Sequence, residues 1–353
     1  MKIGFLLGNV QFGGGEKVLH TLIREFSALG HEIIVFSWNV DWEKERQTFS
    51  HQVTLLSNPP VGIIGKCKAV WSLYRALCTS RPDCLIVFSL ALAEVGVFSA
   101  KFASVPIVLS ERVDPNYLPQ STVHRTLKKI AFSMSSKVVF QTEQVRRFFS
   151  KKIQNKGVVI PNMIMSDDLP VTNPDEVRRV IVAAGRLSEE KNYPLLINAF
   201  ASAALDGYIL RIFGDGPLRS ELESLISSLN MQDRITLEGN VKNLLSHFVH
   251  ADIFAITSSH EGMPNVLLEA MSVGLACVSA DFPSGGASAL IQHNINGVLV
   301  EVGNESDLKS AFERLANDTS FKNVLRKNAL NILETNSKKM IIPQWISVVE
   351  SVV

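Results

Sequence analysis

Short runs of valine, isoleucine and leucine alternate with longer amphipathic segments along this sequence. Such runs indicate strands that are buried on both faces, which is typical of parallel sheets covered by helices. The first series of predicted strands covers residues 2–8, 32–37, 52–56, 84–89, 106–110, 137–141 and 157–161. The second series covers residues 179–185, 208–214, 234–239, 252–258, 276–280 and 297–302. Two successive series predict an α/β protein with two doubly wound, Rossmann-like domains.

The segment 161–176 lies between the two series and contains three prolines together with acidic and polar residues. This composition is typical of a linker. With 353 residues, the chain is long enough to form two domains with full cores. We therefore expect one domain over residues 1–165 and a second that begins at residue 166.

The composition argues against a membrane-spanning or zinc-binding protein. The four cysteines, Cys67, Cys78, Cys84 and Cys277, lack the spacing of a zinc site and indicate buried thiols of a cytosolic protein. The apolar stretch 84–100 is too short for a membrane span and carries a charge at Glu94, so a strand followed by a packed helix explains it better. The amino terminus has too short an apolar run for a signal peptide.

Charge is distributed unevenly over the two halves. Residues 1–165 hold 20 Lys and Arg against 11 Asp and Glu, a balance of +9, whereas residues 166–353 hold 15 against 23, a balance of −8. A basic half suggests that the first domain meets an anionic partner. Chance variation in surface charge remains the alternative explanation.

Three glycine-bearing turns follow predicted strands, where open α/β sheets bind ligands. In the turn 8–18, Gly14 and Gly15 free the backbone before a helix, which suits a phosphate; a plain tight turn is equally compatible. The sequence there fits neither the dinucleotide fingerprint nor the P-loop. The turn around Gly214 is either structural or a support for a nucleotide.

The second of these turns carries two cations. Arg186 and Lys191 stand five positions apart after the strand 179–185 and before a helix that should begin near Pro194. Two fixed cations beside a helix N-terminus suit a diphosphate. Because Glu189 and Glu190 lie between them, two solvated charges are the alternative interpretation.

The stretch HEGMPNVLLEAMSVG, residues 260–274, holds two glutamates eight positions apart. Pro264 suits the first position of a helix, which places Glu261 before the helix and Glu269 roughly 7–8 Å along its axis. The amides near Met263, Asn265 and Val266 form an anion site between the two carboxylates. A nucleotide sugar has this layout, with sugar hydroxyls, a diphosphate and ribose hydroxyls. A surface position for Glu269 is the simpler alternative.

Many transferases that use nucleotide diphosphates hold a divalent metal on an Asp-x-Asp pair. No two aspartates in this sequence are two positions apart. We therefore expect no metal site and no bound cofactor, with the diphosphate charge met by Arg186, Lys191 and helix amides.

Five segments occur in the order and spacing that characterise one known family. They are GRLSEEKN, IFGDGP, LEGNV, SSHEGMPNVLLEAMSVG and NGVLVEVG, and GGGEKV and SERVDPN extend the similarity into the first half. The sequence resembles the family 4 retaining glycosyltransferases of GT-B fold, in a subgroup associated with bacterial surface polysaccharide and O-antigen assembly. The resemblance implies two Rossmann-like domains facing a cleft, an acceptor-binding domain over 1–165, a nucleotide-sugar-binding domain over 166–336, and a final helix over 337–353 that crosses back.

The resemblance also implies roles for matching positions. Glu261 should contact the donor hexose, Glu269 should accept from the ribose, and Arg186 and Lys191 should hold the diphosphate and stabilise its departure. The other implied donor-binding residues are Gly14, Gly15, Gly214, Val241, Gly262, Met263, Pro264, Asn265 and Val266. Retention would follow from attack on the face that the nucleotide leaves, so that Glu261 positions the sugar and is not a general base.

One departure from the family concerns the acceptor side. Many relatives carry a histidine after the strand that matches residues 106–110, where this sequence has Ser110, Glu111 and Arg112. Glu111 and Arg112 are therefore the acceptor-side candidates. A nucleotide-sugar epimerase of the same fold and a non-catalytic nucleotide-sugar-binding protein remain as alternatives to a transferase.

The first half contains two segments in which basic and large apolar residues mix, 61–81 and 124–152. The first includes Ile64 and Trp71, and the second includes Lys128 and Lys129. Such mixtures suit an anionic membrane surface, although helices with a solvated edge look the same. We expect a cytoplasmic enzyme, peripheral on the inner face of the membrane, with a UDP-sugar donor, a glycan or lipid-diphosphate-linked sugar as acceptor, and no nucleic-acid partner.

Overall fold

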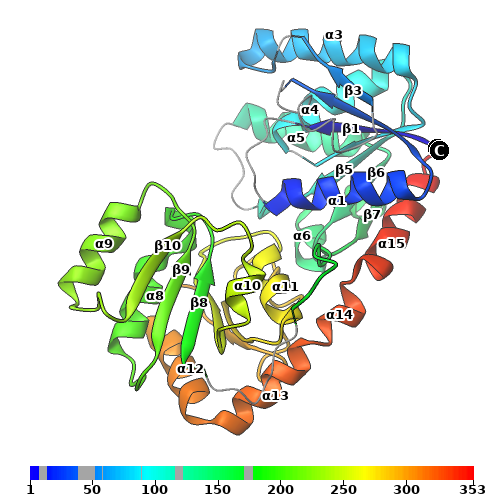
Figure 1. The fold of residues 1–353 in the computed structure, drawn as a ribbon. Helices are drawn as coiled ribbons and strands as arrows, with labels where there is room; N and C mark the ends of the chain where they lie inside the picture. The colour runs from blue at the N-terminus through cyan, green and yellow to red at the C-terminus, as the bar shows by residue number, and fades with distance from the viewer. Residues whose placement is uncertain (8–13, 39–51, 58, 89, 116–121, 171–177) are drawn as a thin grey trace. The chain divides into compact units, whose positions relative to one another are not determined.

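The computed structural model describes residues 1–7, 14–38, 52–57, 59–88, 90–115, 122–170 and 178–353. Contacts divide the chain into two compact units, which are Met1–Met165 together with Lys338–Val353, and Ser166–Ser337. Each unit has a central parallel sheet with helices on both of its faces (Figure 1).

The sheet of the first unit has seven strands in the order β3-β2-β1-β4-β5-β6-β7, and all neighbours are parallel. The strands are β1 (Lys2–Leu7), β2 (Glu32–Ser37), β3 (Gln52–Leu55), β4 (Cys84–Val87), β5 (Ile107–Glu111), β6 (Lys137–Phe140) and β7 (Gly157–Val159). The order reverses between β1 and β4, which is the doubly wound arrangement.

Two hydrophobic clusters cover the two faces of this sheet. On one face, helices α1 (Gly14–Ala28) and α15 (Lys338–Glu350) pack on β1 and β2, with Phe26 and Trp345 fully buried. The other face is covered by α3 (Gly62–Ser80), α4 (Leu90–Phe102), α5 (Thr122–Met134), α6 (Glu143–Phe148) and α7 (Lys151–Gln154). Helix α3 lies at the outside of this layer (Figure 1).

The sheet of the second unit has six parallel strands in the order β10-β9-β8-β11-β12-β13. The strands are β8 (Val180–Ala184), β9 (Ile209–Phe213), β10 (Ile235–Gly239), β11 (Ile253–Ile256), β12 (Ala276–Ala280) and β13 (Val298–Val300). The order reverses between β8 and β11, so this pair of strands forms the switch point where such sheets bind ligands.

Helices cover both faces of the second sheet as well. One layer consists of α8 (Tyr193–Ser202), α9 (Arg219–Ser228), α12 (Glu305–Asn317) and α13 (Thr319–Ala329). The remaining helices are α10 (Leu245–Phe248), α11 (Asn265–Ser272) and α14 (Ile332–Thr335), and a 3-10 turn, η2, spans Glu189–Lys191. Phe248 of α10 packs on Phe254 of β11, with their ring centroids 5.3 Å apart.

The predicted α/β fold is confirmed, and each predicted strand is present with ends that differ by at most two residues. Residues 8 and 89, at the ends of two predicted strands, and residues 171–176 of the predicted linker lie outside the described residues. The apolar stretch 84–100 forms β4 and most of α4, as the sequence predicts.

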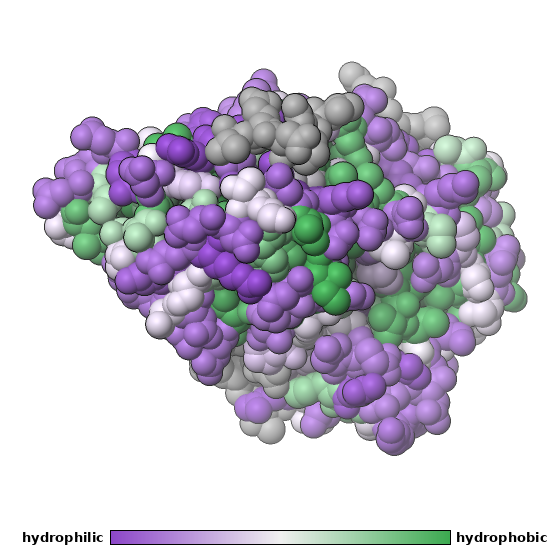
Figure 2. Space-filling model, turned by 90° about the horizontal axis from the view of Figure 1, so that it is seen from below, coloured by the Kyte–Doolittle hydropathy of each residue, from purple (hydrophilic) through white to green (hydrophobic). Residues whose placement is uncertain are grey.

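In the part of the chain that the structure describes, no helix combines the length and hydropathy needed to cross a bilayer. Glu94 of α4 forms an ion pair with Lys66 of α3, with Glu94 Oε2 2.6 Å from Lys66 Nζ. The face drawn in Figure 2 is mainly hydrophilic, with hydrophobic side chains in small groups.

Candidate active site

The carboxyl ends of β8 and β11 bring together two turns that are far apart in the sequence. The backbone N–H of Ser259 donates to the carbonyl of Glu190 at 2.8 Å. The hydroxyl of Thr257 donates to the carbonyl of Lys191 at 2.9 Å. These bonds fix the turn that contains Arg186 and Lys191 against the turn that leads to Glu261, so two predicted groups of site residues form one surface.

Lys191 and Glu261 form an ion pair at the centre of this surface, in which Lys191 Nζ donates to Glu261 Oε1. The hydroxyl of Ser258 donates to the same carboxylate oxygen at 3.1 Å. Each side chain of the pair retains 19% of its exposure, so both remain accessible from solvent. The pair therefore lies where its charged groups can be reached by a ligand.

A small pocket adjoins the ion pair. Its lining residues are Ala184, Lys191, Tyr193, Ala255, Ile256, Thr257, Ser258, Glu261 and Val266. Tyr193 is 3% exposed, and its hydroxyl and Lys191 Nζ both face the α-carbon of Gly185. Burial, and next the charges of Glu261 and Glu190, raise the pKa of the Tyr193 phenol. The phenol is therefore a neutral hydroxyl beside the ion pair.

Glu190 lies at the rim of the site. Burial acts to raise its pKa, but a hydrogen bond from the Ser188 hydroxyl at 2.5 Å and the nearby charges of Lys191 and His260 hold the pKa below its usual range. Arg186 differs from these residues, because its side chain is exposed and the structure gives it no hydrogen bond or ion pair with any described residue. It is the cation that can reorient most freely.

Helix α11 begins at Asn265, and Pro264 occupies the N-cap with φ −74° and ψ 116°. Pro264 was expected at the first helical position, so the helix starts one residue later than predicted; the extended ψ of Pro264 keeps that residue outside the helix. Met263 is buried, Asn265 and Val266 are half-buried at the start of α11, and Glu269 lies in its second turn, also half-buried. The helix thus points its amino end at the turn that carries Glu261.

The loop 282–287 packs against the turn that carries Glu261 and Gly262. The Ser284 hydroxyl donates to the carbonyl of Gly262 at 3.1 Å and accepts from the N–H of Gly286 at 3.2 Å. A Cβ at Gly286 would lie 1.7 Å from that carbonyl oxygen, so only glycine allows the approach. The sequence did not reveal this support, because nothing in its pattern connects residues 284–286 with Gly262.

Gly214 and Val241 follow β9 and β10, and Gly214 lies beside the end of β8. Gly214 adopts φ +127°, and a Cβ there would lie 2.0 Å from the carbonyl oxygen of Gly185. The backbone conformation and the close approach to Gly185 therefore explain why position 214 is a glycine, independently of any nucleotide contact. Val241 is half-buried just after β10. In the first unit, Gly14 and Gly15 open helix α1, and residues 8–13 of the same turn lie outside the described residues.

Glu111 ends β5 and is 1% exposed, with Oε2 2.9 Å from Nζ of Lys128 on α5. Burial raises the pKa of Glu111, and the Lys128 charge opposes that rise. Lys128 itself is 6% exposed. The expectation that Lys128 contacts a membrane is therefore wrong, because its ammonium group is buried against a carboxylate. Lys129 is exposed.

Arg112 is held within the first unit by polar and aromatic contacts. Its Nε donates to Ser110 Oγ at 2.7 Å and its Nη1 donates to Asn162 Oδ1. Its guanidinium carbon lies 4.5 Å from the ring centre of Phe88 and 5.5 Å from that of Trp345. Burial lowers its pKa to about 9. Arg112 Nη2 is a buried donor with no hydrogen-bond partner among the described residues, so its hydrogen-bonding capacity is not fully used.

The geometry defines a class of protein, since two parallel doubly wound domains, one with paired cation and carboxylate at its switch point, are the arrangement of GT-B enzymes. Family comparison agrees with it. Residues 12–167 match the model of Glycosyltransferase Family 4, and residues 166–331 match the model of Glycosyl transferases group 1. The chain therefore belongs to the glycosyltransferases of GT-B fold, with a family 4 domain followed by a group 1 domain.

Two relatives illustrate the similarity in sequence. The chain is 24% identical to a Campylobacter jejuni alpha-1,4-N-acetyl-D-galactosaminyltransferase named for a diNAcBac-PP-undecaprenol-linked acceptor, over 100% of this chain and 99% of the relative. It is also 24% identical to an Escherichia coli UDP-Gal:alpha-D-GlcNAc-diphosphoundecaprenol alpha-1,3-galactosyltransferase, over 77% of this chain and 76% of the relative.

Solved structures share the fold. The Anabaena protein HepE in complex with UDP superposes with a TM-score of 0.87 at 21% identity, covering 99% of this chain and 100% of HepE. The apo form of the lipopolysaccharide outer core galactosyltransferase WaaB superposes with a TM-score of 0.77 at 20% identity, with full coverage of both chains.

Proposed function

We propose that this glycosyltransferase moves a hexose or N-acetylhexosamine, with retention, from a UDP-sugar to a glycan or lipid-diphosphate-linked sugar in bacterial surface polysaccharide biosynthesis. The observation that carries the donor site is the Lys191–Glu261 ion pair at the switch point, beside exposed Arg186 and the start of α11. The relatives support the substrate class, because one is named for a UDP-Gal donor and both are named for undecaprenol-diphosphate-linked acceptors.

In this proposal the ion pair is exchanged when the donor binds. The diphosphate replaces Glu261 as the partner of Lys191, and the Arg186 side chain reorients to bind the oxygens of the same diphosphate. The released Glu261 carboxylate then accepts hydrogen bonds from hydroxyls of the sugar, held in place by the Ser258 hydroxyl at 3.1 Å. Amides at the start of α11 bind the phosphates, and Glu269 accepts from the ribose.

The chemical step follows from the same positions. The acceptor hydroxyl oxygen bonds to the anomeric carbon on the face from which the phosphate oxygen leaves, and the leaving diphosphate takes the hydroxyl proton. Lys191 and Arg186 stabilise the negative charge that develops on the diphosphate, a contribution that typically changes rates by about 10²–10³-fold per donor. No divalent metal is required in this scheme, and transfer in the presence of a chelator tests that point.

On the acceptor side, we propose Arg112 as a contact and Glu111 as its structural neighbour. Arg112 has one buried donor atom without a partner among the described residues, whereas Glu111 is occupied by Lys128. Arg112→Lys keeps a positive charge but loses the planar donor fork, and we expect a higher KM for the acceptor with little change in donor binding.

Transfer by the purified protein tests the proposal directly. UDP release from UDP-sugars in the presence of diphosphate-linked sugar acceptors, with product mass read out, should depend on Arg186. Of the two glutamate variants, Glu261→Ala should reduce transfer more and leave free UDP binding largely intact, while Glu269→Ala should weaken both. An enzyme that interconverts UDP-sugars without an acceptor would instead be an epimerase, and a protein that binds but never releases UDP would be non-catalytic.

A further inference from the structure

The outer side of α3 and the end of α4 carry exposed large apolar residues. Val61 is 78% exposed, Ile64 74%, Trp71 62% and Phe102 69%. Ile64, Lys68, Trp71 and Arg75 recur at spacings of four, three and four residues, which places them on one side of the helix. We call Val61, Ile64, Lys68, Trp71, Arg75 and Phe102 the α3 face.

The α3 face is well ordered by the packing beneath it. Ala69, Leu73 and Leu77 on the opposite side of α3 are fully buried in the core of the first unit. Trp71 and Tyr74 contact each other with ring centroids 5.3 Å apart, and Tyr74 meets Phe102 edge-on at 6.5 Å. The aromatic residues thus form a preassembled group, and the apolar exposure is not a consequence of a loosely packed helix.

The charges around this face have one sign. Residues 61–82 contain four basic and no acidic residues, and of these Lys66 pairs with Glu94 while Lys68 and Arg75 are exposed. Lys101 is exposed in the last turn of α4, one residue before Phe102. The exposed positive charge around the α3 face therefore includes side chains of both α3 and α4.

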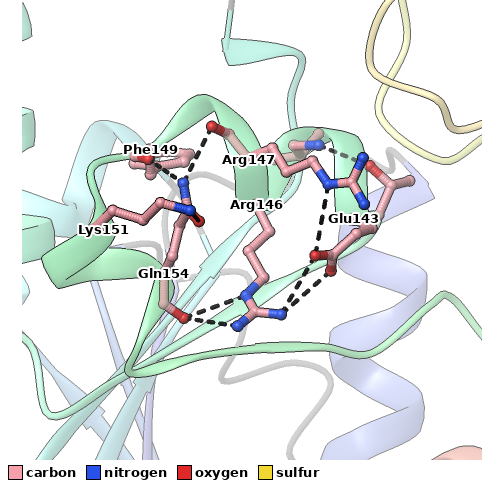
Figure 3. A network of polar contacts seen from close by, with 8 residues as sticks. Glu143, Arg146, Arg147, Phe149, Lys151 and Gln154 are labelled. Atoms are coloured by element: carbon pink, nitrogen blue, oxygen red, sulfur yellow. Dashed lines mark hydrogen bonds and ion pairs between the residues drawn. The ribbon is translucent and has the colours of Figure 1, made fainter.

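The other basic segment, 124–152, differs because several of its charges are paired within the protein. Figure 3 shows Arg146 and Arg147 directed at Glu143, at 3.3 and 3.8 Å, and Arg146 also donates to the carbonyl of Gln154. Phe149 stacks on Phe132 with ring centroids 5.0 Å apart. Lys128 is buried as well, although Lys129 and Lys152 are exposed. The large apolar residues of this segment are less exposed than those of α3, with Ile130 at 40% and Phe148 at 49%.

We propose that the α3 face docks on the surface of a bilayer that contains anionic phospholipid. Trp71, Ile64 and Phe102 enter the boundary between headgroups and acyl chains, and Lys68, Arg75 and Lys101 meet lipid phosphates. A protein partner would have to supply acidic and apolar groups together, whereas an anionic bilayer presents both everywhere. The inference extends the proposed function, since a lipid-diphosphate-linked acceptor is presented at such a surface.

Flotation of the full chain with vesicles tests this inference. Vesicles of phosphatidylcholine alone and vesicles with added phosphatidylglycerol are compared. The wild type should float with the anionic vesicles, and its binding should fall with salt. Lys68→Glu with Arg75→Glu should weaken binding at least roughly 30-fold, at about 1 kcal/mol for each charge lost, and more because the sign is reversed. Ile64→Ser with Trp71→Ser should weaken it to a similar degree.

Matched controls lie elsewhere on the same unit. Lys129→Glu with Lys339→Glu makes the same charge change at exposed positions on α5 and α15, and Leu29→Ser removes an exposed apolar residue at the end of α1. These variants should float like the wild type. Thermal unfolding should be close to wild type for every variant, because the substituted side chains are exposed.

A fluorescent label gives a second readout of the face. The expectation of buried thiols is wrong for Cys67 and Cys78 on α3, which are exposed, whereas Cys84 and Cys277 are buried. An environment-sensitive dye on Cys67, in a Cys78→Ser background, should shift to the blue with anionic vesicles. The same dye on Val324→Cys, an exposed position of α13, in a chain with Cys67→Ser and Cys78→Ser, should not shift.

The results separate docking from catalysis. Transfer to a water-soluble diphosphate-linked sugar without vesicles should proceed at the wild-type rate in both docking variants. Failure of any transfer would overturn the proposed function but leave the flotation result standing. The docking proposal is overturned if the wild type does not bind anionic vesicles, or if the α3 variants bind them as well as the controls do. It is also overturned if the wild type forms a dimer in solution that Trp71→Ser abolishes and does not float with vesicles, because the α3 face would then bind a second copy of the chain.

Discussion

Charged side chains lie at the amino ends of strands β8 and β11 and also at their carboxyl ends. The two groups differ in burial and in the partners that neutralise their charge. At the amino ends, Asp252 is fully buried and accepts from the backbone N–H groups of Arg178 and Arg179 at 3.2 and 3.0 Å. Lys322 Nζ lies 3.2 Å from the same carboxylate, and Arg326 Nη1 lies 3.9 Å away. At the carboxyl ends, Lys191 and Glu261 are partly exposed and form an ion pair with each other.

The difference leads us to propose that one pair of strands serves stability at one end and ligand binding at the other. The Asp252 carboxylate has backbone partners at residues 178–179 and side-chain partners on α13, so no ligand can replace them without opening the core. Lys191 and Glu261 can each exchange their partner for a ligand group at the solvent edge. We therefore expect substitutions at the amino ends to change the free energy of unfolding, and substitutions at the carboxyl ends to change binding and rate.

Asp252→Ala should have the largest effect on stability. It leaves Lys322 and Arg326 buried without their carboxylate, which should lower the free energy of unfolding by about 3–5 kcal/mol. Urea titration measures the change, with Asp206→Ala as an exposed control that should stay within about 0.5 kcal/mol. Equal losses in both variants would remove the distinction between the two ends.

Lys191→Met should have the largest effect on catalysis. Loss of its charge should reduce kcat/KM by roughly 10²–10³-fold, while unfolding changes by less than about 1 kcal/mol because the pair is partly exposed. Steady-state kinetics with Lys242→Ala as an exposed lysine control checks this. A Lys191→Met protein that unfolds readily but turns over normally when folded would assign Lys191 to structure.

The sequence predicted the strands well, because double burial leaves a continuous apolar run at each of them. It also predicted Arg186, Lys191 and Glu261 as site residues, but it could not show that Lys191 pairs with Glu261, which stands 70 residues away. Lys128 was misjudged for a similar reason, since its partner Glu111 lies on another element. Burial and pairing of charges depend on the packing of segments that the sequence does not place.

Tyr193 lines the pocket at the ion pair, and the sequence did not single it out. Its position before Pro194 reads as the start of a helix, and only the structure brings its hydroxyl beside Lys191. Tyr193→Phe removes the hydroxyl and keeps the packing, so we expect a loss of roughly threefold to tenfold in kcat/KM, of the size of one neutral hydrogen bond. Unfolding should hardly change. Unaltered kinetics would restrict Tyr193 to core packing.

The smallest effect concerns pH at the rim of the site. Because the folded-state pKa of Glu190 is lowered, its carboxylate contributes stability above its unfolded pKa, and that contribution is lost as pH falls through the folded value. The stability difference between wild type and Glu190→Gln should therefore shrink in acid. Urea titrations from neutral pH downward measure it, with Glu189→Gln as the exposed control on the same turn, and a constant difference would contradict the assignment.

Calorimetric titration with UDP tests the exchange of partners at Lys191 most directly. If a diphosphate displaces Glu261 from Lys191, Lys191→Met should bind UDP roughly 10–100-fold more weakly, as expected for the loss of a charge-assisted hydrogen bond. Glu261→Gln should bind UDP at least as tightly as the wild type, because Lys191 then has no ion pair with a carboxylate that UDP must break. Unchanged binding in Lys191→Met, or an equal loss in both variants, would contradict the account.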